Sequence, residues 1–372
     1  MTIGRATPQV VMLAPGEVFG GVETQLLGLC ESLRGRGGPA PVIALFHDRE
    51  LAARAREVGL DVVVIRARHR YDPAAARDLC GLVDRAGADV LHVHGYRAAV
   101  TAAVAGSRLG VPVVKTEHGL PEPGGGPLVR LKTALNRRLD GWATRRIGAA
   151  VCYVTADIME RCRGVHRGLE RRVVHNGIAP LDPAATSRPA ELAAGACEVG
   201  LVGRVSAVKG LDHALRAMAS DSMPAHVRLH VIGSGPLERS LSFAARDLGL
   251  ADRVLFHGFR RNVYDWLAHL DVLLMPSLHE GLPYTLLEAM SLGAAVVASR
   301  VGGLAEVLED GRTGLLVEVG DEAGIAAAVA RLAADPQLRA SLGGAAAREQ
   351  RARYTLETMT EAYLGIYGAS IG

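Results

Sequence analysis

Short apolar runs alternate with amphipathic stretches along all 372 residues of the chain. In the first half, the runs that we expect to form strands are 10–14, 42–46, 61–65, 89–94, 113–116 and 150–154. In the second half, they are 198–202, 227–232, 254–257, 271–275, 295–298 and 314–317. Apolar residues between them recur at helical spacing, as in Val22–Leu33. This alternation predicts βα units around parallel sheets.

A stretch rich in proline, alanine and polar residues interrupts the alternation near the middle of the chain. The pattern predicts an N-terminal domain over 1–180, a linker over 181–197 and a second domain over 198–350. A final helix over 351–372 is expected to cross back to the N-terminal domain. The predicted fold class is α/β, with two Rossmann-like, doubly wound domains. Ligands of such sheets bind beyond the carboxyl ends of the strands.

Composition excludes some classes of function. With 49% hydrophobic and 22% charged residues the chain is globular, and a net charge of +3 argues against a nucleic-acid partner. Five cysteines without a Cys-x-x-Cys pair indicate a reducing, cytoplasmic compartment rather than a disulfide framework or zinc site. We see no signal peptide and no apolar run long enough for a membrane span. The sequence therefore predicts a soluble protein or one on a membrane surface.

The common nucleotide and hydrolase motifs are missing. A P-loop needs Gly-Lys, which does not occur, and Gly233-Ser-Gly235-Pro-Leu-Glu238 lacks the third glycine of a dinucleotide fingerprint. There is no Asp-x-Asp for a metal-bound nucleotide and no His-Glu-x-x-His. Gly-x-Ser-x-Gly occurs only in the last five residues, where no helix can follow it.

The segment 276–290 is the most informative part of the chain. Pro283 suits the first turn of a helix, where its missing N–H costs nothing. The N–H groups of Leu282, Tyr284 and Thr285 are then expected to form an anion site suited to a diphosphate.

Two carboxylates flank this predicted helix start, with Glu280 before it and Glu288 about two turns into it. By helical rise they are ~12 Å apart, whereas paired glycosidase carboxylates need roughly 5–9.5 Å. They suit two separate sets of hydroxyls, such as those of a sugar and a ribose. The alternative is that both are ordinary solvated residues.

A second candidate site, 202–210, directly follows the first strand of the second domain. Gly203 allows close approach of a ligand to the backbone, while Arg204 and Lys209 place two cations at the strand end. Both could also be ordinary surface cations.

Together these segments resemble glycosyltransferase family 4, the retaining, nucleotide-sugar-dependent enzymes of GT-B fold. The resemblance covers about 198–332. The matching residues are Gly203-Arg204…Lys209-Gly210, Gly233-Ser-Gly235, His257-Gly258-Phe259, Glu280-x7-Glu288 and Val301-Gly302-Gly303…Glu306…Asp310-Gly311…Gly314.

The resemblance implies roles for these residues. Arg204 and Lys209 would neutralise the donor diphosphate, Glu280 would face the sugar hydroxyls, and Glu288 would hold the ribose. The backbone of Gly281, Leu282 and Pro283 would surround the sugar and phosphates. The loops with Gly233 and Gly235, and with Phe259 and Arg260, would border the base. The family needs no divalent metal, so no cofactor is expected.

The first half of the chain resembles the family at fewer positions. Gly20 and Gly21 resemble the N-terminal glycine loop of the family, and His118 follows a strand where the family places a histidine near the reacting sugar. A glycine pair is also common in plain turns, and a lone histidine is often structural. His92 and His94 are interpreted as a strand end with at most an indirect role.

The stretch 127–147 has six basic residues against one acid, with apolar residues at helical spacing. Such a helix can lie on an anionic membrane surface. Alternatively, its apolar residues face the core and its arginines face solvent.

We therefore expect a glycosyltransferase that moves a sugar from a UDP- or GDP-sugar to a glycan or lipid-linked acceptor with retention, in polysaccharide or glycolipid synthesis. Two alternatives remain at this point: a GT-B sugar-nucleotide epimerase, and a catalytically silent nucleotide-sugar binding protein.

Overall fold

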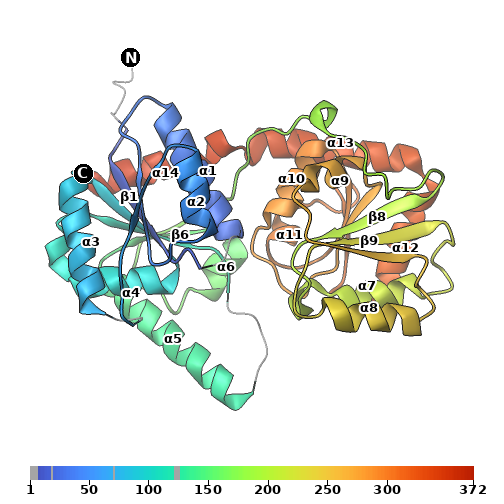
Figure 1. Ribbon diagram of the computed structural model, residues 1–372, viewed down its shortest axis with the longest axis horizontal. Helices are drawn as coiled ribbons and strands as arrows, with labels where there is room; N and C mark the ends of the chain where they lie inside the picture. The colour runs from blue at the N-terminus through green and yellow to red at the C-terminus, as the bar shows by residue number, and fades with distance from the viewer. Residues whose placement is uncertain (1–6, 18–19, 70–71, 121–125) are drawn as a thin grey trace. The chain divides into compact units, whose positions relative to one another are not determined.

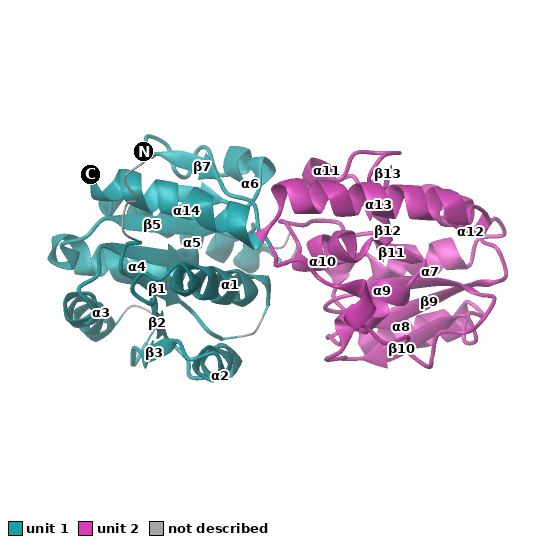
Figure 2. Cartoon of the chain, turned by 90° about the horizontal axis from the view of Figure 1, so that it is seen from above, with its two compact units in different colours: residues 1–177, 356–372 teal, residues 178–355 magenta. Residues whose placement is uncertain are grey.

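The chain divides into two compact units. The computed structural model describes residues 7–17, 20–69, 72–120 and 126–372. Unit 1 comprises Met1–Gly177 and Leu356–Gly372, and unit 2 comprises Ile178–Thr355 (Figure 2). The chain thus leaves unit 1 once and returns to it for the last helix.

Unit 1 is built on a seven-stranded parallel sheet with the strand order β3-β2-β1-β4-β5-β6-β7. Its strands are β1 (Val10–Ala14), β2 (Val42–Leu45), β3 (Asp61–Val64), β4 (Val90–His94), β5 (Val113–Glu117), β6 (Ala150–Tyr153) and β7 (Arg171–Val173). The order reverses between β1 and β4. Their carboxyl ends therefore form a topological switch point, where ligands of such sheets bind.

Helices cover both faces of this sheet (Figure 1). They are α1 (Gly21–Gly35), α2 (Glu50–Glu57), α3 (Pro73–Ala86), α4 (Gly95–Ala105), α5 (Pro127–Arg146), α6 (Ala156–Arg161) and α14 (Leu356–Ile371). Successive residues of β1 point to opposite faces. Met12 belongs to a core with Leu29 of α1 and Tyr363 of α14, whereas Leu13 belongs to a second core with Leu79 of α3.

Unit 2 repeats this plan with a six-stranded parallel sheet of order β10-β9-β8-β11-β12-β13. Its strands are β8 (Cys197–Val202), β9 (Val227–Ile232), β10 (Val254–Gly258), β11 (Val272–Met275), β12 (Ala295–Ser299) and β13 (Leu315–Val317). Its helices are α7 (Leu211–Met218), α8 (Glu238–Asp247), α9 (Val263–His269), α10 (Tyr284–Leu292), α11 (Gly302–Val307), α12 (Glu322–Ala334) and α13 (Pro336–Arg353). The switch point lies between β8 and β11.

The twelve predicted strands are all present, with ends that differ by no more than one residue. Strand β7 was not predicted, because its three residues, Arg171–Val173, are short and mostly polar. The stretch expected to link the domains runs along unit 2. Its Leu181 N–H donates to Ser291 Oγ at 3.0 Å, and its Ser187 N–H donates to Asp265 Oδ1 at 3.0 Å.

Helix α5 extends from the body of unit 1 (Figure 1). Its buried residues are Asp140, Gly141, Ala143 and Thr144, in its second half. Large apolar side chains of the helix, by contrast, are exposed: Leu128, Val129, Leu131, Leu135 and Trp142. The alternative in which these residues face the core is therefore wrong. In the described parts of the chain, no helix is both long and apolar enough to cross a membrane.

Candidate functional site

In unit 2, an ion pair joins the two loops at the switch point. Lys209 Nζ, after β8, lies 2.6 Å from Glu280 Oε1, after β11. Ser277 Oγ donates to the same carboxylate oxygen at 2.7 Å, and Glu280 is only 8% exposed. The two loops are also joined through their backbones, because Leu278 N–H donates to Val208 O at 2.8 Å. Lys209 and Glu280, which the sequence analysis assigned to two separate candidate sites, thus form one cluster.

Glycines allow the backbone to pack closely around this cluster. A Cβ on Gly302 or Gly303 would lie about 2 Å from the carbonyl oxygen of Glu280 or Gly281, respectively. Gly303 N–H also donates to Gly281 O at 2.9 Å. Gly210 has φ +64°, and a Cβ there would lie 2.0 Å from Pro276 O. These glycines support the loop that carries Glu280, which is a packing role.

Gly233 and Gly235 have a similar role beside β8. Cβ atoms on them would lie 1.9 Å from Gly203 O and 2.3 Å from Val205 O. Gly203 and Gly233 both have φ +140°, a conformation that favours glycine. The structure therefore gives these glycines a packing reason that is independent of any ligand.

Pro283 is the N-cap of α10 rather than a residue of its first turn. Its ψ of 136° is extended, and its carbonyl accepts a hydrogen bond from Leu286 N–H at 3.2 Å. The helix therefore begins at Tyr284, one residue later than predicted. The N–H groups of Tyr284 and Thr285 now lie in the first turn, where backbone donors favour anions.

Glu288 lies in the middle of α10, and Tyr264 Oη of α9 donates to its Oε1 at 3.4 Å. Burial raises the pKa of Glu288 to about 7, although the Tyr264 hydrogen bond opposes that shift. This side chain can therefore change its charge near neutral pH.

The remaining predicted residues of unit 2 lie on its surface. Arg204 and Phe259 are exposed. Arg260 is exposed too, and its Nη2 lies 3.1 Å from Glu191 Oε1. The ion pair with Glu191 was not foreseen, since 69 residues separate the two side chains.

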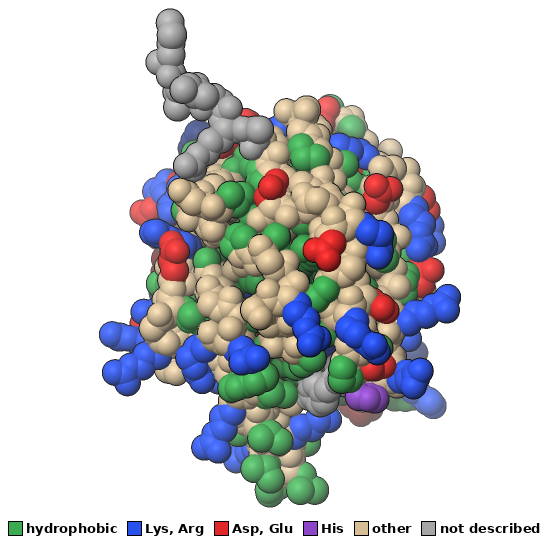
Figure 3. Space-filling model, turned by 90° about the vertical axis from the view of Figure 1, so that its left-hand side faces the viewer, with side chains coloured by type: hydrophobic (Ala, Val, Ile, Leu, Met, Phe, Trp, Pro, Cys, Tyr) green, Lys and Arg blue, Asp and Glu red, His purple; other side chains and the backbone are tan. Residues whose placement is uncertain are grey.

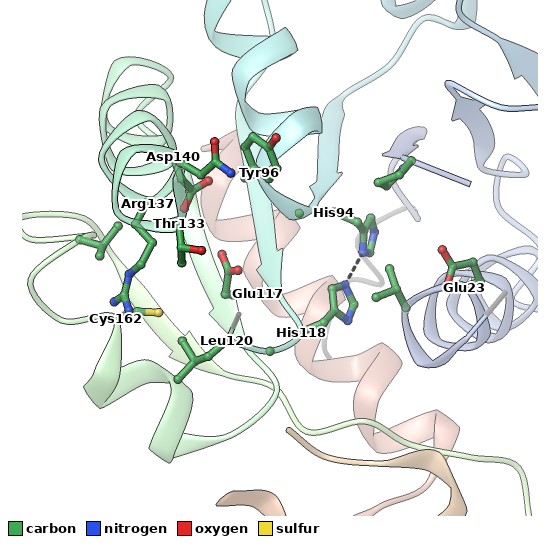
Figure 4. Close-up of a pocket in the computed structure, with 16 residues that line it drawn as sticks. Glu23, His94, Tyr96, Glu117, His118, Leu120, Thr133, Arg137, Asp140 and Cys162 are labelled. Atoms are coloured by element: carbon green, nitrogen blue, oxygen red, sulfur yellow. Dashed lines mark hydrogen bonds between the residues drawn. The ribbon is translucent and has the colours of Figure 1, made fainter. Parts of the chain in front are cut away.

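Unit 1 contains a pocket of about 550 Å³ at its own switch point. Val22 and Glu23 of α1 line it, together with His94 at the end of β4 and His118 after β5 (Figure 4). His118 Nε2 lies 2.9 Å from His94 Nδ1. Burial lowers the pKa of His118 to about 3, so the ring is neutral near pH 7.

The glycine pair precedes α1 at the side of this pocket. Gly20 is the N-cap, Gly21 begins the helix, and Gly20 N–H donates to Glu23 Oε2 at 3.1 Å. Burial raises the pKa of the Glu23 carboxyl. The two glycines thus end the loop after β1 and orient Glu23.

Two family models match the chain: Glycosyltransferase Family 4 over residues 19–180 and Glycosyl transferases group 1 over residues 196–335. The 2-deoxystreptamine N-acetyl-D-glucosaminyltransferase of Streptomyces fradiae is 30% identical over 394 aligned residues, which cover 96% of this chain and 92% of that protein. This chain belongs to glycosyltransferase family 4. The lipopolysaccharide core biosynthesis glycosyltransferase LpsD of Rhizobium meliloti is 31% identical, over 59% of this chain and 64% of that relative. The match therefore spans less than two thirds of LpsD.

The fold is that of GT-B glycosyltransferases. Anabaena Alr3699/HepE, solved in complex with UDP, superposes with a TM-score of 0.83. The alignment covers 97% of this chain and 100% of HepE, at 21% sequence identity.

In this family 4 chain, a buried charge cluster forms the far side of the unit 1 pocket. Lys115 Nζ lies 2.7 Å from both Asp140 carboxylate oxygens and 2.8 Å from Glu117 Oε2. His166 Nε2 lies 3.2 Å from Asp140 Oδ2, and Tyr153 Oη lies 2.7 Å from His166 Nδ1. Glu117, Asp140 and His166 are close enough to share a metal ion, but the Lys115 ammonium already lies among them.

Burial alone would lower the pKa of Lys115, yet the Glu117 and Asp140 carboxylates raise it above its ordinary value. The cluster is therefore a charged network in which the lysine stays protonated. Sequence reasoning missed it. The one available signal is a lysine directly after two valines inside a predicted strand, in a chain with only three lysines.

A second buried network crosses the unit 2 sheet. His230 Nε2 lies 2.5 Å from Glu198 Oε2, and His230 Nδ1 lies 2.8 Å from His257 Nε2. Burial lowers the pKa of His257 to about 4. This network reaches the end of β10, next to Phe259, and it was not predicted either.

Proposed function

We propose that this chain is a retaining glycosyltransferase that uses a UDP- or GDP-sugar and a glycan or lipid-linked acceptor. The observation that carries the proposal is the ion pair of Lys209 and Glu280 at the switch point of unit 2. A cation and a carboxylate held together there suit the two ends of a sugar diphosphate. The UDP bound to HepE supports a uridine nucleotide as the first donor to test.

In the proposed reaction, the bond between the anomeric carbon and the diphosphate oxygen breaks, and the acceptor oxygen bonds to the same face of the sugar. The acceptor proton passes to the departing phosphate. Arg204 and Lys209 stabilise the negative charge on that leaving group, which is the electrostatic contribution that dominates in many enzymes. Glu280 accepts hydrogen bonds from the sugar hydroxyls, and Glu288 from those of the ribose.

The test of the donor is the melting temperature with a panel of UDP, GDP, ADP and their sugars, each with EDTA and with magnesium. A ligand that binds only the folded state raises the melting temperature by mass action. We expect a shift with one nucleotide, unaffected by EDTA and lost in Lys209→Ala. No shift with any nucleotide would overturn the proposed donor site.

The reaction type needs a separate measurement, which is NMR of the product anomer after incubation with the donor. Transfer with retention supports the proposal. Conversion of the donor sugar without an acceptor would indicate an epimerase, and nucleotide binding without turnover would indicate a silent binding protein.

The acceptor part of the proposal includes peripheral membrane contact through residues 127–147. Named relatives differ in their acceptors, since one acts on 2-deoxystreptamine and another in lipopolysaccharide core biosynthesis. The choice between a soluble glycan and a lipid-linked acceptor therefore depends on features of this chain.

A further inference from the structure

Helix α5 carries an apolar stripe that no other described element of unit 1 covers. Leu128, Leu131 and Leu135 are 82%, 68% and 64% exposed, and Trp142 continues the same side of the helix with 47% exposed. Their spacing of three, four and seven residues places them on one face. Figure 3 shows hydrophobic side chains at the lower end of the molecule, with Lys and Arg side chains beside them.

Packing fixes the orientation of this stripe. Asp140 of α5 is buried against Lys115, and Thr144 Oγ1 lies 3.4 Å from the same ammonium. The polar side of the helix is therefore held against the domain. Leu128, Leu131 and Leu135 lie roughly opposite that side and face solvent.

Cations accompany the stripe along the whole helix. The six basic residues of this segment are Arg130, Lys132, Arg137, Arg138, Arg145 and Arg146. Its one acid, Asp140, is already paired with Lys115. The charged residues on the exposed part of α5 are thus all basic.

Three of these arginines line a groove of about 240 Å³, namely Arg137, Arg138 and Arg145. At about 100° per residue, Arg138 and Arg145 lie between the apolar stripe and the side of α5 that faces the pocket. Thr133, Asn136 and Arg137 line that pocket. Around one helix, the chain therefore presents a pocket, then a cationic groove, then an apolar stripe.

We propose that α5 lies on an anionic lipid bilayer, with the leucine stripe among the acyl chains and the arginine groove at the lipid phosphates. Amphipathic helices with an apolar face and basic flanks bind such surfaces, and Trp142 suits the interface. The charge of the exposed face favours this occupant over a second, equally basic copy of α5. This inference rests on the proposed function in one respect: it makes the acceptor a membrane amphiphile whose polar head reaches the pocket.

The test is cosedimentation of the full chain with vesicles of phosphatidylcholine, alone or with about 30% phosphatidylglycerol. We expect binding to the anionic vesicles only, weakened in about 0.5 M sodium chloride. Changing any one arginine of the groove to glutamine should weaken vesicle binding about five-fold, because one charge near the lipid surface is lost.

Trp142 supplies a direct readout of insertion, because the only other tryptophan, Trp266, is buried in unit 2. On anionic vesicles its emission should shift to the blue and be quenched by brominated acyl chains. Trp142→Phe should remove that signal but leave cosedimentation.

The decisive variant is Leu128→Gln/Leu131→Gln/Leu135→Gln, which should reduce vesicle binding to background. Its matched control is Phe243→Gln/Leu248→Gln, which removes exposed apolar side chains from unit 2. Full vesicle binding by the leucine variant would overturn the inference, as would a dimer in light scattering that the same variant abolishes.

The nucleotide-induced shift in melting temperature, measured without vesicles, separates the two proposals. If the leucine variant keeps that shift and loses vesicle binding, both stand. If the wild-type chain binds vesicles but no nucleotide, only the proposed function fails. If it binds nucleotide but no anionic vesicle, only the membrane inference fails.

Discussion

His94 Nδ1 lies 2.9 Å from His118 Nε2, and the two rings are stacked with centroids 5.2 Å apart. Burial lowers the pKa of His118 to about 3 and that of His94 well below its ordinary value, so both rings are neutral near pH 7. Each neutral ring has one N–H. One of the two hydrogens lies between the rings, on His94 Nδ1 or His118 Nε2. The other is then carried by one of the two outer nitrogens, His94 Nε2 or His118 Nδ1.

The surroundings of His94 indicate where these hydrogens lie. His94 Nε2 is buried and has no hydrogen-bond partner among the described residues. An orphaned buried N–H is rarer in proteins than an orphaned acceptor. We therefore assign the hydrogen of His94 to Nδ1, which leaves His118 with Nδ1–H as a donor for a ligand in the pocket.

The first prediction concerns His94 as a positioning residue for His118. His94→Leu removes the partner of His118 Nε2, so both tautomers of His118 become accessible and transfer should fall about ten-fold. His94→Asn keeps an amide N–H near the position of Nδ1 and should retain most of the activity. The measurement is the ¹⁵N shift of His118 in labelled protein, with kcat and KM for the donor.

A wild-type spectrum with a bare His118 Nδ1 would contradict this assignment. So would a His94→Leu variant that keeps one tautomer and full kcat. His118→Ala identifies the resonance, because it removes only that ring.

The second prediction concerns the ion pair in unit 2. Lys209→Ala and Glu280→Ala should each reduce transfer by about 100-fold or more, because each removes a charged group that we place against the donor. Each single change should also cost stability, since it leaves the other charge partly buried. The double variant should then be more stable than the sum of the single changes predicts.

The measurements for this pair are initial transfer rates and urea unfolding. Arg216→Ala is the control, because Arg216 is an exposed cation of the same domain that pairs with Asp212 and Glu322. Near-wild-type turnover in Lys209→Ala or Glu280→Ala would remove our site assignment.

Most of the architecture follows from the sequence, because parallel sheets with helices on both faces need nearly continuous apolar strands. The same topology brings Lys209 and Glu280 together, since both follow strands that meet at a switch point. Local spacing was enough to predict the strands, whereas the pairing of Lys209 with Glu280 was seen only in the structure.

The sequence could not show which side of α5 faces the domain. Helical spacing identifies an apolar side, and the usual expectation is that this side is buried. Here the buried Lys115 binds Asp140, so the polar side faces inward. Such pairs join residues far apart in the chain, and spacing within a helix contains no information about them. The role of Lys115 was missed for the same reason.

The third prediction concerns Glu288 and pH. Its pKa of about 7 means that it is largely protonated at pH 6 and ionised at pH 8. Ribose hydroxyls that donate to the carboxylate favour the ionised form. Nucleotide affinity should therefore rise about ten-fold from pH 6 to pH 8, and binding at pH 6 should release a proton.

Isothermal titration in buffers of different ionisation enthalpy measures both the affinity and the released proton. Glu288→Gln should bind more weakly at pH 8 and lose the pH dependence. The pH dependence of folding stability has the opposite sign to that of nucleotide affinity. The folded pKa lies above the ordinary value, so Glu288 destabilises the fold as pH rises from about 4.5 to 7. Equal pH dependence in the two proteins would contradict the ribose role.

The last prediction concerns the buried network in unit 1. Lys115→Met leaves the Asp140 and Glu117 carboxylates without their ammonium, and should lower the free energy of unfolding by about 3–5 kcal/mol at pH 7. Lys132→Met on the exposed side of α5 is the matched control and should change it by less than about 0.5 kcal/mol. Urea unfolding measures both.

The stability difference between the wild-type chain and Lys115→Met can be measured as a function of pH, which tests whether an unpaired buried charge causes it. Although burial opposes the shift, His166 and Lys115 hold the pKa of Asp140 below its ordinary value. The stability that Asp140 contributes is therefore present above about pH 4 and lost as pH falls through the folded pKa. In Lys115→Met the same carboxyl is easier to protonate, so the deficit of the variant should shrink between pH 7 and pH 4. A deficit that stays constant over this range would mean that lost packing, rather than an unpaired buried charge, destabilises the variant.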